Sequence, residues 1–228
     1  MDEDFEDNDF DLLSDFNDDV LNEGDETINS RYVKPKKQKY LNSKNIKFLN
    51  AQQLAKNIDL QSKESVFAIV DGSFVFGDFI LAFLHYHNIK AERLDISTLS
   101  LSMHNIVGIE TFIDKGYINK LNFLIGYYFF AHERTKLIKE MYKSFDKDDI
   151  FQLAVCRNHM KCVTILTDKG NKIVIHGSAN LRSSDNLEQF SLSFNDELYD
   201  FITEFNDKLL LEYKTIEKPI TNKTLLNL

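Results

Sequence analysis

The side chains best suited to chemistry lie between residues 159 and 188. His159 and Lys161 are two residues apart on a predicted strand, so both would point to the same face of a sheet. Ser178 and Asn180 follow, and Glu188 comes next. Together they supply a nucleophile, a cation, neutral hydrogen-bond donors and a carboxylate. Such a set could attack a phosphodiester without a metal ion.

From about residue 44 the sequence alternates between strand and helix patterns. The predicted strands are Val66–Val70, Arg93–Leu101, Leu121–Phe129, Phe151–Cys156, Lys161–Thr167, Lys172–His176 and Gln189–Phe194. The predicted helices are Phe76–His87, Asn105–Lys115, His132–Phe145 and Asp196–Leu211. This alternation predicts an α/β domain with a layered mixed or parallel sheet flanked by helices. Residues 168–171 are expected to form a hairpin turn, with Gly170 at positive φ.

Two short segments in this region resemble a known signature. His159-Met160-Lys161 and Gly177-Ser178-Ala179-Asn180-Leu181 resemble the H-x-K and G-S-x-N motifs of the phospholipase D superfamily. The likeness covers residues from about 64 to 211. With a single copy of the motif, the chain most resembles the single-motif endonucleases of bacteria. It also resembles phospholipase D-like proteins of bacteriophages.

The resemblance implies a role for each residue of the set. His159 would attack phosphorus to form a phosphohistidine, while a second histidine protonates the leaving oxygen. Because each chain carries one such histidine, a homodimer with the two copies facing across a two-fold axis is expected. Lys161 would bind a non-bridging oxygen, Asn180 and Ser178 would donate hydrogen bonds, and Glu188 would accept from the imidazole.

Three neighbouring residues are further candidates for contacting the substrate. Gly177 belongs to the second motif, and Arg182 follows it. His176 precedes it on a strand, where a structural role is the alternative. These residues extend the predicted site without changing its chemistry.

The sequence departs from the family pattern at one position. The usual acid five residues after the motif lysine is replaced by Leu166, and Asp168 is not expected to be catalytic. No cofactor is predicted. No metal site is predicted either, because His85 and His87 have no carboxylates at metal-ligand spacing.

Charge is divided unevenly along the chain. The formal net charge is −9, but residues 2–26 hold 13 acidic residues and no Lys or Arg. The rest carries 23 acidic against 27 basic residues, so it is mildly basic. We expect a disordered acidic tail and basic linker over residues 1–43 and the folded domain over residues 44–228. The tail would bind the domain's own groove or a protein partner.

The basic body favours nucleic acid as the partner, with DNA favoured over RNA. No apolar run approaches the ~20 residues that span a bilayer, so neither a membrane location nor a lipid substrate is expected. The predicted function is that of a metal-independent phosphodiesterase, a nuclease, in the cytoplasm of a bacterial or phage-infected host cell. The alternatives are a catalytically inactive nucleic-acid-binding module and a structural or assembly protein of a phage particle.

Overall fold

The computed structural model describes residues 44–47, 51–72, 74–182 and 186–213. All of them belong to one compact unit that spans residues 40–228. The tail and linker predicted for residues 1–43 lie outside the described residues.

A mixed eight-stranded sheet forms the centre of the domain, in the order β1-β2-β8-β7-β6-β3-β4-β5. Its strands are β1 Lys44–Lys47, β2 Val66–Val70, β3 Ala91–Thr98, β4 Leu121–Gly126, β5 Phe151–Cys156, β6 Cys162–Thr167, β7 Lys172–Gly177 and β8 Glu188–Phe194. β3, β4 and β5 are parallel, as are β1 and β2. The antiparallel run β6-β7-β8 joins these two parallel parts.

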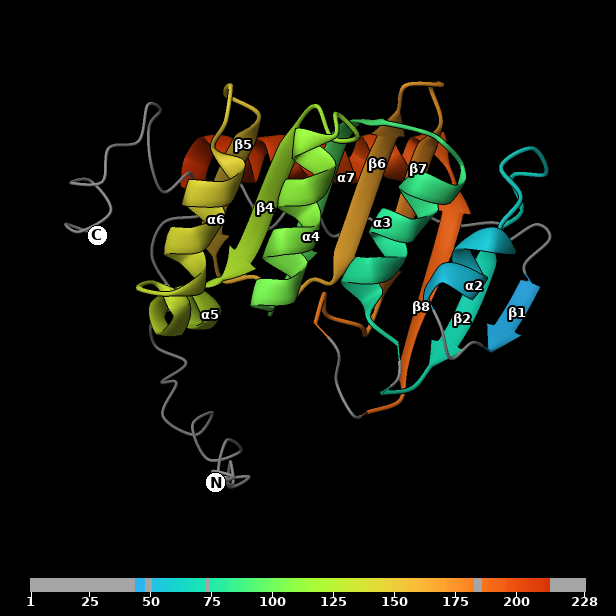
Figure 1. The fold of residues 1–228 in the computed structure, drawn as a ribbon, viewed down its shortest axis with the longest axis horizontal. Coiled ribbons are helices and arrows are strands. Elements are labelled where there is room, and N and C mark those ends of the chain that lie inside the picture. Colours follow the sequence, from blue (N-terminus) through green and yellow to red (C-terminus); the bar gives the residue numbers. More distant parts are fainter. Residues whose placement is uncertain (1–43, 48–50, 73, 183–185, 214–228) are drawn as a thin grey trace, which may run out of the picture. The chain divides into compact units, whose positions relative to one another are not determined.

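Helices cover both faces of this sheet. They are α2 Ala51–Lys56, α3 Phe76–Tyr86, α4 Met103–Asp114, α5 Tyr127–Glu133, α6 Leu137–Phe145 and α7 Asp196–Tyr213. Figure 1 shows α3, α4 and α6 side by side on one face, with α7 crossing the other. The predicted α/β class is therefore confirmed. Within the described ranges, no helix has the length and apolarity needed to cross a membrane.

An aromatic cluster packs α3 against the sheet close to the predicted site. The α3 residues Phe76 and Phe79 are buried, as is Phe190 of β8. The ring centroid of Phe190 lies 5.0 Å from that of Phe76 and 5.2 Å from that of Phe79. Burial of each ring contributes roughly 1.5–3 kcal/mol, so the cluster fixes the first turn of α3 against the first half of β8.

The structure corrects two of the predicted elements and adds two short ones. The strand expected over Leu121–Phe129 ends at Gly126, and Tyr127 begins α5. The helix expected over His132–Phe145 is divided between the end of α5 and α6, which begins at Leu137. Helical geometry buries Phe129 and exposes the two preceding tyrosines, a pattern that a continuous apolar run does not reveal. The short polar elements β1 and α2 were not predicted.

The β6–β7 hairpin confirms the expected turn. Gly170 has a φ of 76° in the turn between the two strands, a conformation that glycine adopts without a steric penalty. β6 begins at Cys162, one residue later than expected.

Candidate active site

One edge of the sheet gathers all the residues of the predicted set. β2, β3, β4, β5 and β7 end at this edge, whereas β6 and β8 begin there, as their pairing directions require. The downward-pointing arrowheads of β2 and β4 mark it in Figure 1. We call it the motif edge. The segments at this edge are residues 157–161, which precede β6, residues 177–182, which follow β7, and Glu188, which starts β8.

His159 and Lys161 lie in the connection between β5 and β6, and the prediction that both are on a strand is wrong. The reason is topological: β3 and β4 separate β5 from β6, so the connection must pass over the ends of two strands. His159 is exposed there, and Lys161 is half-buried. The backbone N–H of Gly177 donates to the carbonyl of Lys161 at 3.2 Å, which joins the two motif segments.

Asn158 holds the connection in position. Its Nδ2 donates to Oγ of Ser97 and to the carbonyl of Leu124, each at 2.9 Å. Its Oδ1 accepts from the backbone N–H of Met160 at 2.8 Å. One amide therefore fixes the backbone on both sides of His159 relative to β3 and β4. Asn158 was not predicted from the sequence, because an asparagine in a loop carries no distinguishing pattern.

Asn180 is anchored to the end of β3. Its Oδ1 accepts from the backbone N–H of Leu99 at 3.1 Å and lies 3.4 Å from the hydroxyl of Thr98. Because a backbone N–H can only donate, this contact identifies the carbonyl side of the amide. The NH₂ group then remains to donate toward another acceptor. The next carbonyl, that of Leu181, accepts from the N–H of Gly77 at 2.9 Å, which ties the segment to α3.

Ser178 and Glu188 are brought together across the β7–β8 connection. The Ser178 hydroxyl donates to the Glu188 carboxylate. The backbone N–H of Gln189 donates to Ser178 Oγ at 3.0 Å, and the N–H of Ser178 donates to the carbonyl of Gln189 at 2.8 Å. Ser178 thus fastens the start of β8 and orients Glu188. This serine–glutamate contact could not be inferred from spacing alone.

The other candidates surround these segments. His176 is half-buried on β7, with Nε2 at 3.1 Å from the hydroxyl of Ser191, and burial lowers the pKa of its imidazole. Arg182 is exposed, and it lines a small hollow together with Asn180 and Glu188. Arg182, the amide of Asn180 and the carboxylate of Glu188 therefore surround the same hollow.

Asp168 lies at the opposite edge of the sheet. It follows β6, whose six residues separate it from Lys161 by roughly 20 Å at 3.3 Å per residue. Its carboxylate accepts from the N–H of Lys90 at 3.0 Å, and its own N–H donates to the Lys90 carbonyl at 3.0 Å. Asp168 therefore fastens a turn, remote from the motif edge.

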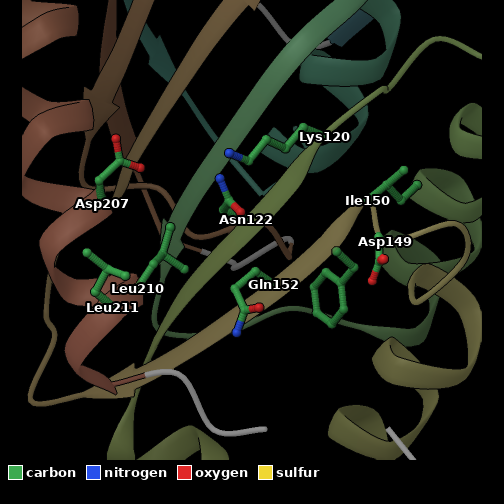
Figure 2. Close-up of a pocket in the computed structure, with 9 residues that line it drawn as sticks. Lys120, Asn122, Asp149, Ile150, Gln152, Asp207, Leu210 and Leu211 are labelled. Carbon is green, nitrogen blue, oxygen red and sulfur yellow. The ribbon is translucent and has the colours of Figure 1, made fainter. Parts of the chain in front are cut away.

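A second, larger pocket lies away from the motif edge. Its volume is about 510 Å³, and it opens between α7 and the amino ends of β4 and β5 (Figure 2). It is lined by Lys120, Asn122, Asp149, Ile150, Phe151, Gln152, Asp207, Leu210 and Leu211.

In the part of the chain that the structure describes, no group of three or more His, Cys, Asp or Glu could hold a metal ion.

Comparison with known proteins gives matches among solved structures alone. No protein-family model matches the chain, and neither does any curated protein. A polyphosphate kinase from Porphyromonas gingivalis is 12% identical, with a TM-score of 0.50 over 75% of this chain. Nuc from Salmonella typhimurium, a phospholipase D family member, is 16% identical, with a TM-score of 0.40 over 55% of this chain and 81% of its own. The domain shares its α/β fold with this polyphosphate kinase.

Identities this low bear on the fold alone and show nothing of the activity. TrmBL2, an archaeal chromatin protein that binds DNA, is 11% identical, with a TM-score of 0.44 over 72% of this chain. The chain spans 59% of the length of TrmBL2 and 30% of that of the polyphosphate kinase. A phospholipase D family member is thus among the structural neighbours of a chain whose two motifs resemble those of that family.

Proposed function

We propose that the phospholipase D-like domain is a metal-independent phosphodiesterase that cuts nucleic acid through a phosphohistidine at His159. The observation that carries the proposal is the convergence of the two motif segments at one edge of the sheet. The bond from Gly177 N–H to the Lys161 carbonyl joins them directly. A nucleophile, a cation and an amide donor therefore share one solvent-facing edge.

In the first step an imidazole nitrogen of His159 forms a bond to phosphorus as the bond to the leaving oxygen breaks. His159 of the partner subunit donates its proton to that oxygen. Lys161 and the NH₂ of Asn180 stabilise the negative charge that grows on the non-bridging oxygens. In the second step the partner's His159, now neutral, takes a proton from water, which attacks phosphorus and releases the first imidazole.

A two-fold homodimer supplies the second histidine, because each residue near a two-fold axis meets its own copy. The exposure of His159 supports this arrangement, since the side chain is accessible to another subunit. Glu188 would orient the imidazole, and Ser178 would orient Glu188 through the hydroxyl–carboxylate contact. The assembly would then have one active site for every two chains.

The substrate is proposed to be nucleic acid. A site on an exposed sheet edge is open to a long polyanion, and the mildly basic composition outside residues 2–26 favours phosphate contacts.

The test is incubation of the protein with plasmid, single-stranded DNA and RNA in the presence of EDTA. Cleavage of at least one of them is expected, together with an acid-labile phosphoryl label on His159 and the mass of a dimer in solution. Absence of cleavage in all three reactions would overturn the proposal, and so would an active monomer.

The second candidate function is nucleic-acid binding without catalysis. It is favoured by one observation: Leu166 replaces the family's acid, and Asp168 lies at the other edge of the sheet. Tight binding without cleavage in the same reactions would support this candidate.

Asn158→Ala is expected to lower kcat about 10- to 100-fold while leaving the fold intact. The variant loses the bonds to Ser97, Leu124 and Met160 that fix the segment carrying His159, and small displacements of a nucleophile have effects of this size. Rates with saturating substrate, together with circular dichroism, would measure this. Asn119→Ala is the matched control. Asn119 is exposed and donates to Glu92, and it lies before β4, at the edge of the sheet opposite the motif edge. Equal kcat values for both variants would contradict a positioning role.

A further inference from the structure

Two adjacent tyrosines stand out on the surface. Tyr127 is 65% exposed and Tyr128 is 67% exposed, more than any other Phe or Tyr side chain in the described part of the chain. They form the first turn of α5, directly after β4. Exposing two large rings in succession has no packing benefit, since the buried residue of this turn is Phe129.

Tyr127 and Tyr128 follow a glycine that lies close to the residues holding the motif segments in place. Gly126, which precedes them, pairs with Cys156 at the end of β5. A Cβ on Gly126 would lie 3.0 Å from the carbonyl oxygen of Asn158 and 3.4 Å from Cδ2 of Leu99. Asn158 positions His159, and the N–H of Leu99 binds Asn180. Tyr127 therefore directly follows Gly126, which lies against Asn158 and Leu99, the residues that hold the two motif segments.

The ring of Tyr128 packs against the imidazole of His132. The ring centroids of Tyr128 and His132 are 3.9 Å apart with an interplanar angle of 33°, and His132 Nδ1 lies 2.9 Å from the Tyr128 carbonyl. This contact leaves the outer face of the tyrosine available for stacking and reduces the freedom it would lose on binding.

The adjoining surface carries positive charge. Arg134, Lys136 and Lys139 follow in sequence, and Lys136 and Lys139 are exposed. The carboxylates of this stretch are Glu133 and Glu140, and Glu140 pairs with Lys143. Exposed aromatic rings beside cationic side chains are the combination that binds single-stranded nucleic acid, with rings stacking on bases and cations contacting phosphates.

We propose that Tyr127 and Tyr128 form a stacking platform for unpaired nucleobases, which makes single-stranded nucleic acid the preferred substrate. The proposal rests on the proposed function and deepens it. In a duplex the faces of each base are covered by its neighbours, so a surface platform has no base face to contact. In a single strand, two bases stack on the tyrosines while the adjoining phosphate reaches His159 and Lys161.

The experiment measures binding in a His159→Ala background, so that the strand is not cut. The probes are a fluorescent oligothymidylate, an oligouridylate and a DNA duplex, all in EDTA. Tyr127→Ala with Tyr128→Ala is expected to weaken single-strand binding about 10-fold per ring and duplex binding less than about two-fold. Tyr86→Ala is the control, because Tyr86 is 51% exposed at the far end of α3 and should change nothing. Phenylalanine at both positions should retain the affinity.

A second measurement separates this proposal from the proposed function. With His159 present, the double alanine variant should hydrolyse bis(p-nitrophenyl) phosphate at the wild-type rate, since that diester does not need the platform. If the wild type hydrolyses no diester, the proposed function fails, and the binding assay still decides the platform. Unchanged single-strand affinity, or an equal loss for duplex, would overturn the platform. Binding of both nucleic acids too weak to measure would overturn it as well.

Discussion

Replacing His159 by alanine is expected to reduce kcat by about 10⁴-fold or more, which corresponds to roughly 5 kcal/mol of transition-state stabilisation. The variant has no nucleophile to form the phosphohistidine. Lys161 and Asn180 can then assist only the slower, direct attack of water on phosphorus. Folding should be unaffected, because His159 is exposed in a connection between strands. Diester hydrolysis in EDTA and thermal unfolding measure the two effects.

His85→Ala is the matched control for this variant. His85 is also exposed, but it lies near the end of α3, at the opposite edge of the sheet. It should retain full activity. A His159→Ala protein that still cleaves at the wild-type rate would rule out the phosphohistidine mechanism.

Mixing subunits tests whether the site is shared. If wild-type and His159→Ala chains exchange at random in equal amounts, about one quarter of the dimers carry two intact histidines. Activity per chain should then fall to about a quarter of the wild-type value. A fall to one half would mean that each chain acts independently.

Gly177→Ala is expected to destabilise the domain by about 3 kcal/mol or more, beyond the usual range for an added methyl group in a packed site. A Cβ at this position would lie 2.1 Å from the carbonyl oxygen of Gln189 and 2.5 Å from Cα of Phe190. Both atoms belong to the backbone of β8, so relief requires the strand to move away from β7. That movement would also separate Ser178 from Glu188, and activity should fall with stability.

Chemical denaturation measures this loss, and Gly170→Ala is the comparison. Gly170 has a φ of 76° with nothing within 4 Å of an added Cβ, so its replacement should cost about 1 kcal/mol from backbone conformation alone. If Gly177→Ala proved as stable as Gly170→Ala, the close approach of β7 and β8 would not hold in solution.

The sequence was sufficient for the parts of the fold that depend on local patterns. The bounds of β2 and β5 agree with the predicted runs, and Gly170 marked the hairpin turn. The end of β4 was mispredicted, because the run through Phe129 is apolar in either conformation.

Residue types and spacing also identified the motif segments of the candidate site, but not what orients them. The contacts of Asn158 with Ser97 and of Asn180 with Leu99 join segments about 60 and 80 positions apart. Such contacts depend on strand order, which a pattern of hydrophobicity does not specify. The platform tyrosines were missed for a related reason: their exposure depends on where β4 stops.

The antiparallel run β6-β7-β8 has a consequence for the order of assembly. Its strands are neighbours in sequence, so their pairing closes short loops and should form early in folding. This run holds Lys161 against Gly177 and Ser178 against Glu188. The ties from Asn158 and Asn180 to β3 span much longer loops and should form late. Partial unfolding that starts at β3 would therefore abolish the proposed activity while the central hairpins persist. Activity should then be a more sensitive probe of the native state than secondary structure.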